Sequence, residues 1–252
     1  MRQLAACLLG LMLASAGWAV EDATTLRVPA GETEIPVARY SAAGSRVLLW
    51  LPSEYGVLPQ EHRAARALAQ QGIETWLADL YGARFLPAVA SSAETLPAED
   101  VYHLIRAAFA AKREVWLSSA GRGAKYALEG ARLWQEREGQ GKPLAGAILL
   151  YPNLYLAQPE PGSEPAYLPV TAQTRLNVYI LQGELSPWYW TLDTLTSVMR
   201  SSGSQIVVRT VAGIRDRFYF RDDAMPAERE LGEHLPTFMR DLILHPPAES
   251  PK

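Results

Sequence analysis

Residues 115–128 read VWLSSAGRGAKYAL: an apolar run, a short stretch of mostly small residues, and a helix-forming segment. The apolar run is typical of a buried strand, and small residues allow a tight turn from it into the helix that follows. Many enzymes carry a nucleophilic serine at the tip of such a turn, yet here the tip is Gly121, which has no side chain. We expect Gly121 to adopt a strained or left-handed backbone, which glycine tolerates because it lacks a Cβ atom.

The composition is that of a globular protein. Of the 252 residues, 48% are apolar and 20% are charged, which is enough to build a full hydrophobic core. The net charge is −3 and the calculated pI is about 5.9. Because a nucleic-acid-binding protein would usually show a basic excess, we expect no nucleic-acid partner.

The first nineteen residues predict a secretory signal peptide. Arg2 precedes an apolar run that is followed by small residues and by Ala19, where cleavage is expected. The alternative, a membrane-anchoring helix, fits less well because the run is shorter than the roughly 20 residues that a span needs. We therefore expect a periplasmic or secreted protein without a stable membrane span. Cys7 is the only cysteine, so the mature chain would contain no disulfide.

The rest of the chain predicts an α/β fold, with a mostly parallel central sheet covered by helices on both faces. Two short proline-punctuated segments suit an antiparallel N-terminal hairpin, and apolar runs of buried-strand length follow. Strands are expected at 45–52, 73–79, 114–119, 144–152, 176–183 and 204–211, with helices at 59–72, 97–112, 121–137, 187–203 and 226–243. We expect one domain over residues 20–245, a flexible tail over 246–252, and a kink in the last helix at Pro236.

Four segments in this order resemble the α/β-hydrolase superfamily. They are ALAQQGIETWLADLYG (67–82), VWLSSAGRGAKYAL (115–128), VYILQGELSPW (178–188) and VVRTVAGIRDRFYF (207–220). They are similar, respectively, to the family's helix and fourth strand, its nucleophile elbow, its acid loop and its histidine loop. The resemblance implies a single-domain α/β-hydrolase fold over nearly the whole mature chain.

The same resemblance implies that the catalytic triad is degenerate. The elbow requires small residues two places before and after the nucleophile, and Ser119 and Gly123 satisfy this around Gly121. The acid position of the family's Gly-x-x-Asp phrase is Ser186, and the histidine position of its Gly-x-x-His-x-Phe phrase is Asp216. The four histidines, His62, His103, His234 and His245, all lie in or beyond predicted helices, and none follows the last strand, where the general base is needed.

The loop that usually supplies the oxyanion hole also departs from the family. Where the family commonly has His-Gly, this chain has Leu51-Pro52-Ser53-Glu54. Because proline has no N–H group, this loop offers fewer donors to a developing oxyanion.

Two interpretations of function follow. In the first, the protein is an exported, catalytically inactive α/β-hydrolase-fold protein that binds a small ligand or a protein partner. In the second, it is a serine hydrolase of the esterase type that uses Ser119 as an off-register nucleophile. The two are distinguished by whether Ser119 Oγ has a base within hydrogen-bond reach. The His, Asp and Glu residues show no metal-ligand spacing, and no cofactor is expected.

A pocket without a triad remains a candidate binding site. Arg122, Arg215 and Arg217 are expected near the elbow, together with Trp188 and Trp190 from the acid loop. Arginine binds carboxylates and phosphates in a bidentate manner, so an anionic ligand or an acidic segment of a partner is the predicted occupant. Alternatively, the arginines are solvated charges at the rim, and two of the three consecutive aromatics at 188–190 pack while one lies on the surface.

Overall fold

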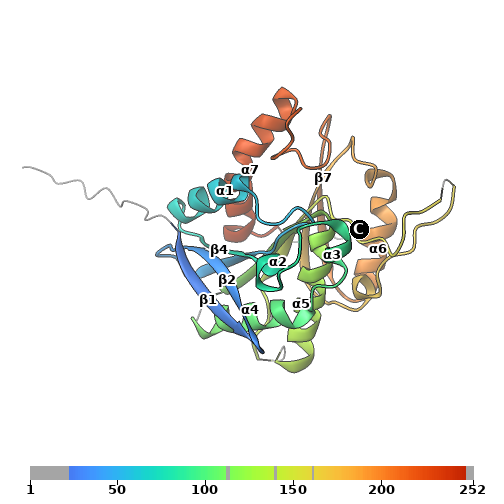
Figure 1. Ribbon diagram of the computed structural model, residues 1–252. Helices are drawn as coiled ribbons and strands as arrows, with labels where there is room; N and C mark the ends of the chain where they lie inside the picture. Colours follow the sequence, from blue (N-terminus) through green and yellow to red (C-terminus); the bar gives the residue numbers. More distant parts are fainter. Residues whose placement is uncertain (1–22, 112–113, 139–140, 161, 248–252) are drawn as a thin grey trace, which may run out of the picture.

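An eight-stranded mixed sheet runs through the molecule in the order β1-β2-β4-β3-β5-β6-β7-β8 (Figure 1). The structure is a computed structural model that describes residues 23–111, 114–138, 141–160 and 162–247. The predicted signal peptide and most of the predicted tail lie outside the described residues. The strands are β1 (Thr24–Ala30), β2 (Thr33–Tyr40), β3 (Arg46–Trp50), β4 (Glu74–Ala78), β5 (Glu114–Ala120), β6 (Gly146–Leu150), β7 (Asn177–Gly183) and β8 (Gln205–Val211).

The first two strands form the predicted antiparallel hairpin at one edge of the sheet. Gly31, in the turn between them, has a φ of +65°, which favours glycine. β2 pairs with β4 in the antiparallel direction, and every pairing from β4 through β8 is parallel. The predicted fold class is therefore confirmed.

Helices cover both faces of this sheet. Alternate residues of β3 point to opposite sides: Leu48 and Trp50 pack into one core cluster, and Val47 and Leu49 into the other. The first face is covered by α1 (Pro59–Gln70) and α7 (Pro226–Leu244), which lie side by side in Figure 1. The second face is covered by α4 (Ala98–Ala110), α5 (Ala124–Arg137) and α6 (Leu192–Ser201). This double coverage explains why the central strands read as nearly continuous apolar runs.

Short helices are the main difference from the sequence-based expectation. α2 (Leu80–Ala83), α3 (Ala90–Ala93) and the 3₁₀ turn η2 (Pro169–Ala172) were not predicted, because a helix of one turn has no apolar periodicity to detect. The predicted helix at 121–137 begins with the 3₁₀ turn η1 (Gly121–Gly123), and the one at 187–203 is divided into η3 (Tyr189–Thr191) and α6. α7 is assigned as one continuous helix through Pro236.

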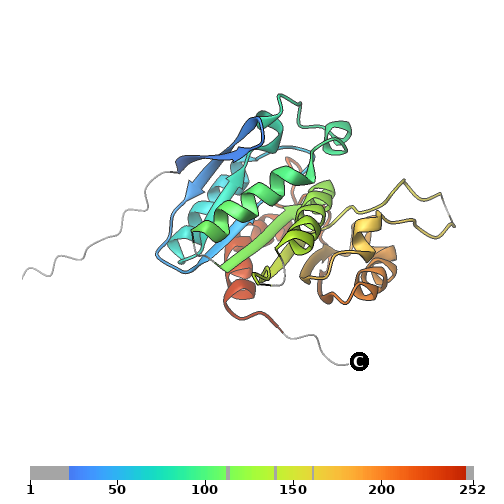
Figure 2. The same ribbon diagram turned by 90° about the horizontal axis from the view of Figure 1, so that it is seen from below.

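The long connection from β6 to β7 projects away from the body of the molecule (Figure 2). Within this connection, the rings of Tyr155 and Tyr167 are stacked with their centroids 5.2 Å apart. No helix in the described ranges is long and apolar enough to cross a membrane.

α5, the helix that follows the elbow, is held against α4 by a close approach at Gly130. A Cβ atom at Gly130 would lie 2.2 Å from Cγ1 of Val101, a fully buried residue of α4. Since valine is stiff at χ1, its side chain cannot easily rotate away from an added methyl group.

We expect Gly130→Ala to destabilise the protein by about 1–3 kcal/mol, although alanine normally favours a helix over glycine by about 1 kcal/mol. Urea unfolding monitored by tryptophan fluorescence measures this difference. Gly141→Ala is the matched control because its added Cβ would meet no atom within 4 Å. A neutral or stabilising effect at position 130 would contradict the close approach of the two helices.

A buried carboxyl group joins α1 to the loop after β8. Glu61 is almost completely buried; it accepts hydrogen bonds from the Leu58 N–H (3.0 Å) and from the Tyr219 hydroxyl (3.0 Å). Burial raises the pKa of Glu61 from its ordinary value of 4.5 to about 7, with the two hydrogen bonds opposing the shift. Between these two values the folded protein keeps a proton that the unfolded chain has lost. Stability therefore falls as the pH rises through this window.

Glu61→Gln should consequently stabilise the protein at pH 8, by about 1–3 kcal/mol, and have little effect at pH 4, because glutamine imitates the protonated carboxyl group. Unfolding free energies measured from pH 4 to pH 8 test this, with Glu233→Gln on the exposed face of α7 as a control expected to stay within about 0.5 kcal/mol of the parent. A variant that is less stable than the parent at pH 8 would refute the assignment.

Candidate functional site

The elbow between β5 and α5 has the backbone of a nucleophile turn without a nucleophile. Gly121, at its tip, has a φ of +54°, which confirms the predicted left-handed conformation. Two residues on, Gly123 is packed so tightly that a Cβ there would lie 2.0 Å from Ser119 Oγ and 2.3 Å from the Pro52 carbonyl oxygen. The small residues therefore occupy the places that the elbow geometry requires.

Ser119, the alternative nucleophile, faces away from any base. Its side chain is fully buried, and its hydroxyl donates a long hydrogen bond of 3.4 Å to the carbonyl oxygen of Pro52. A serine becomes nucleophilic when a neighbouring base can take its proton, and a backbone carbonyl cannot do so. Within the described residues, the hydroxyl of Ser119 thus lacks the activating partner that the second interpretation needs.

The residues at the acid and histidine positions lie together, although neither has the expected chemistry. Ser186 follows β7 and Asp216 follows β8, and the Ser186 side chain is near enough to the Asp216 carboxyl group to lower its pKa. Burial raises the pKa of Asp216, and hydrogen bonding to Ser186 and Gln182 partly opposes this effect. Oδ1 of Asp216 is buried without a hydrogen-bond partner among the described residues. The fold therefore brings the three degenerate positions to one place but supplies no imidazole there.

A carboxylate that the sequence did not single out faces the elbow. Glu54, from the loop after β3, accepts a hydrogen bond from the backbone N–H of Arg122, with Oε2 3.0 Å from the nitrogen. The same oxygen lies 2.7 Å from the point where a Cβ of residue 121 would stand. In this type of turn, the N–H of the residue after the nucleophile is an oxyanion-hole donor. In this chain that N–H already donates to the Glu54 carboxylate.

A cavity of about 340 Å³ opens beside the elbow. The predicted convergence of the elbow, the histidine loop and the acid loop is confirmed, because all three contribute to its walls. The lining residues are Glu54, Tyr55, Gly121, Tyr151, Asn153, Leu185, Pro187, Trp188, Arg215, Asp216, Arg217 and Arg221. Tyr151, which directly follows β6, has a φ of +38°, an uncommon conformation for a residue with a side chain. It lies in the cavity wall, as strained residues at functional sites often do.

Arg215 lines this cavity but is already engaged in ion pairs. Its guanidinium donates to the fully buried Glu228, at 2.6 Å, and to Asp223, at 2.9 Å. Hydrogen bonding to Arg215 holds the pKa of Glu228 at about 2. Glu228 also accepts the Met225 N–H at the start of α7, so this group ties the histidine loop to that helix.

The other two predicted arginines lie in different surroundings. Arg217 lines the cavity, donates to the Tyr55 hydroxyl at 3.3 Å and lies over the Tyr55 ring. Arg122 does not belong to the cavity lining; its side chain forms an ion pair with the exposed Glu94 at 3.6 Å. The structure thus brings two of the three arginines to the cavity.

The two predicted tryptophans are also separated. Trp188 lines the cavity and packs against Tyr155, whereas Trp190 is 84% exposed. The prediction that one of the three consecutive aromatics would be exposed is confirmed. All large apolar side chains exposed in the described residues lie in loops after the carboxyl ends of β3, β4, β6 and β7: Tyr55, Phe85, Val89, Leu156, Leu185 and Trp190. The segments that follow the carboxyl ends of parallel strands begin at the same edge of the sheet, and a contiguous exposed apolar patch there would be typical of an interaction surface.

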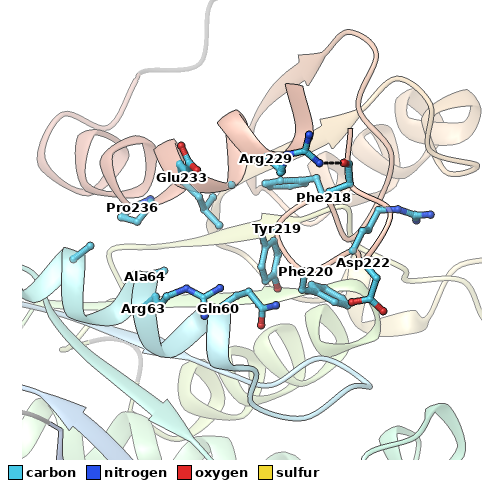
Figure 3. Close-up of a pocket in the computed structure, with 15 residues that line it drawn as sticks. Gln60, Arg63, Ala64, Phe218, Tyr219, Phe220, Asp222, Arg229, Glu233 and Pro236 are labelled. Carbon is cyan, nitrogen blue, oxygen red and sulfur yellow. Dashed lines mark hydrogen bonds between the residues drawn. The ribbon is translucent and has the colours of Figure 1, made fainter. Parts of the chain in front are cut away.

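A second and larger cavity, of about 510 Å³, lies between α1 and α7 (Figure 3). Gln60 and Arg63 of α1 line it from one side, Arg229 and Glu233 of α7 from the other, and the aromatic run 218–220 closes it. The triad positions do not contribute to it, so we place the candidate site at the smaller cavity.

The histidines lie away from the candidate site. His62 shares a hydrogen bond with Tyr40, and His234 with the carbonyl oxygen of Glu230. His103 lies on α4 and His245 ends α7, and none of the four lines the cavity beside the elbow. In the described part of the chain, no group of three or more His, Cys, Asp or Glu residues could hold a metal ion.

Solved structures with similar folds are hydrolases by name. An esterase from Pyrobaculum calidifontis superimposes with a TM-score of 0.67 and 12% sequence identity, over 89% of this chain and 87% of that one. A dienelactone hydrolase candidate from Klebsiella pneumoniae gives 0.65 and 16%, over 88% and 96%. An esterase from Thermogutta terrifontis gives 0.63 and 13%, over 90% and 94%.

At these identities the likeness concerns the fold and not the reaction. No protein-family model matches the sequence, and neither does the sequence of any curated protein. The likeness extends over nearly nine-tenths of the chain, and it agrees with the mostly parallel sheet, the helices on both faces and the elbow after β5. This chain has the α/β-hydrolase fold.

Proposed function

We propose that this protein is a non-catalytic member of the α/β-hydrolase fold that binds a ligand or a partner at the carboxyl edge of its sheet. The observation that carries the proposal is the elbow itself: its tip is Gly121, and the nearby serine hydroxyl of Ser119 points toward the Pro52 carbonyl. Acyl transfer by a serine hydrolase needs a nucleophile, a base to take its proton and an unoccupied oxyanion hole. Among the described residues, the elbow tip has no side chain, the Ser119 hydroxyl donates to a backbone carbonyl and not to a base, and Glu54 occupies the Arg122 N–H of the oxyanion hole.

The esterase interpretation is the second candidate. The names of the similar solved structures favour it over an inactive protein, since they include several esterases. The local chemistry opposes it, because Ser119 is fully buried and its hydroxyl donates to the Pro52 carbonyl oxygen, so it would have to rotate before it could approach a carboxyl group of the cavity. An activity measurement separates the two candidates.

The charges around the cavity weigh against the anionic ligand expected from the sequence. Arg215 is neutralised by Glu228 and Asp223, and Arg221 also binds Asp223. Two carboxyl groups, Glu54 and Asp216, face the same space. We therefore favour a neutral or cationic ligand group that binds against the Tyr55 and Trp188 rings, since aromatic faces attract cations. The exposed apolar side chains on the same edge support a protein partner as the other occupant.

The purified protein should not be labelled by a broad fluorophosphonate probe, and its hydrolysis of p-nitrophenyl acetate should not change in Ser119→Ala. The physical reason is that Ser119 has no base and Gly121 has no side chain. A serine esterase in the same assay shows that the probe is active. Labelling of the parent chain that disappears in Ser119→Ala would establish the esterase interpretation instead.

Export forms a further part of the proposal, and it concerns residues outside the described ranges. The protein recovered from the periplasm or the medium of expressing cells should have an intact mass that begins near Val20 and should contain no free thiol, because Cys7 belongs to the predicted signal. Recovery of a membrane-bound chain that retains residue 1 would contradict it.

A further inference from the structure

The contact between Glu54 and the elbow joins residues that are far apart in the sequence, and it lies at the position of the oxyanion hole. The carboxylate comes from a loop 68 residues before Arg122 and accepts the Arg122 N–H at 3.0 Å. It also takes the space that a side chain at residue 121 would need, since its Oε2 and Oε1 atoms lie 2.7 Å and 3.2 Å from the calculated Cβ position. The Glu54 carboxylate thus fills the space of a nucleophile side chain and accepts the N–H that a substrate oxygen would accept in a hydrolase.

The loop that carries Glu54 is folded to present it. The side chain of Ser53 accepts the Tyr55 N–H at 3.2 Å, and its backbone carbonyl accepts the Gly56 N–H at 3.1 Å, which closes a tight turn around residue 54. The ring of Tyr55 packs against Phe220 on the far side of the cavity. The carboxylate is therefore held at the elbow by a turn on one side and an aromatic contact on the other.

We propose that Glu54 is an internal anion that occupies the elbow: it closes the Arg122 N–H to external carboxylates and acyl oxygens, and its removal opens the cavity to a small carboxylate. The inference deepens the proposed non-catalytic function and rests on it, because an elbow that turns over substrate could not tolerate a resident carboxylate.

The advantage of an internal carboxylate is its effective concentration. A group held in place by a short, ordered loop binds within the molecule and avoids most of the loss of translational and rotational freedom that a free ligand undergoes, so its effective concentration lies above that of a free acid at tens of millimolar. Its negative charge also repels an incoming anion at short range, because the interaction is strong in a partly desolvated cavity. A small acid at tens of millimolar should consequently not displace it.

The test compares variants in which residue 54 does or does not reach the Arg122 N–H. Glu54→Ala and Glu54→Ser are too short to reach it, whereas Glu54→Gln keeps an acceptor oxygen at the same place. Glu94→Ala is the matched control, since it removes the ion-pair partner of the Arg122 side chain and leaves the backbone N–H engaged. Each protein is titrated with sodium acetate against sodium chloride of equal ionic strength, by thermal unfolding and by ¹⁵N–¹H NMR.

We expect the two short variants to unfold at a temperature about 3–8 °C below that of the parent, and 50 mM acetate to restore about 2–4 °C of this loss. The Arg122 amide resonance should shift in a saturable manner with acetate in these variants alone. The parent, Glu54→Gln and Glu94→Ala should respond no more to acetate than to chloride.

Other outcomes overturn the inference. If acetate shifts the Arg122 amide of the parent as strongly as that of the short variants, Glu54 does not close the site. The same conclusion follows if the short variants are folded and show no acetate response, or if Glu94→Ala responds equally. Should either short variant fail to fold, the other and the parent titration still decide the question.

Labelling of the same variants with the fluorophosphonate probe distinguishes a failure of this inference from a failure of the proposed function. The short variants should remain unlabelled, because opening the elbow adds no nucleophile. Labelling of Glu54→Ala that Ser119→Ala abolishes would overturn the non-catalytic function and, with it, the inference that rests on it. Conversely, an unlabelled protein without an acetate response would leave the proposed function standing and remove the inference.

Discussion

The geometry of the candidate site depends on the close approach of three segments at Gly123. The carbonyl oxygen of Pro52, the hydroxyl of Ser119 and the start of α5 meet so tightly that no Cβ atom fits at residue 123. This contact fixes the loop after β3 against the elbow, and it therefore places Glu54 at the Arg122 N–H. It also confines Ser119 between backbone atoms. The same packing that preserves the shape of a hydrolase elbow thus keeps Ser119, the alternative nucleophile, buried and away from the cavity.

The strands and their order could be predicted because burial on both faces gives a simple signal. β6 is apolar and buried along its whole length and β5 is buried from Val115 to Ala120, and parallel strands buried in this way need helical connections. The convergence of the elbow with the loops after β7 and β8 also followed from topology, since ligand-facing loops gather at the carboxyl edge of such a sheet. Short helices such as α2 gave no signal, because a single turn is set by local hydrogen bonds, here one that the Gly82 N–H donates to the Asp79 carboxylate.

The chemistry of the site was less accessible from the sequence. Arg215 was expected to face a ligand, but a linear sequence does not reveal that Glu228, at the first turn of α7, folds back to bind it. Glu54 was noted only as part of a loop that lacks His-Gly. Its contact with Arg122 depends on the spacing between β3 and β5, which are neighbours in the sheet and far apart along the chain. The signal that would have found it is a carboxylate at an oxyanion loop beside an elbow without a nucleophile.

The space shared by Glu54 and Gly121 has a consequence for how such a chain can change by single substitutions. A side chain introduced at residue 121 would start 2.7 Å from a carboxylate oxygen, so a serine there conflicts with Glu54 as long as Glu54 remains. Loss of Glu54, in turn, leaves the Arg122 N–H without its acceptor. Each step toward a working elbow therefore passes through a less stable intermediate unless both residues change together, and Ser186 and Asp216 would still have to be replaced. The contact therefore makes single substitutions toward a catalytic elbow unfavourable, and this separates the chain from the hydrolases whose fold it shares.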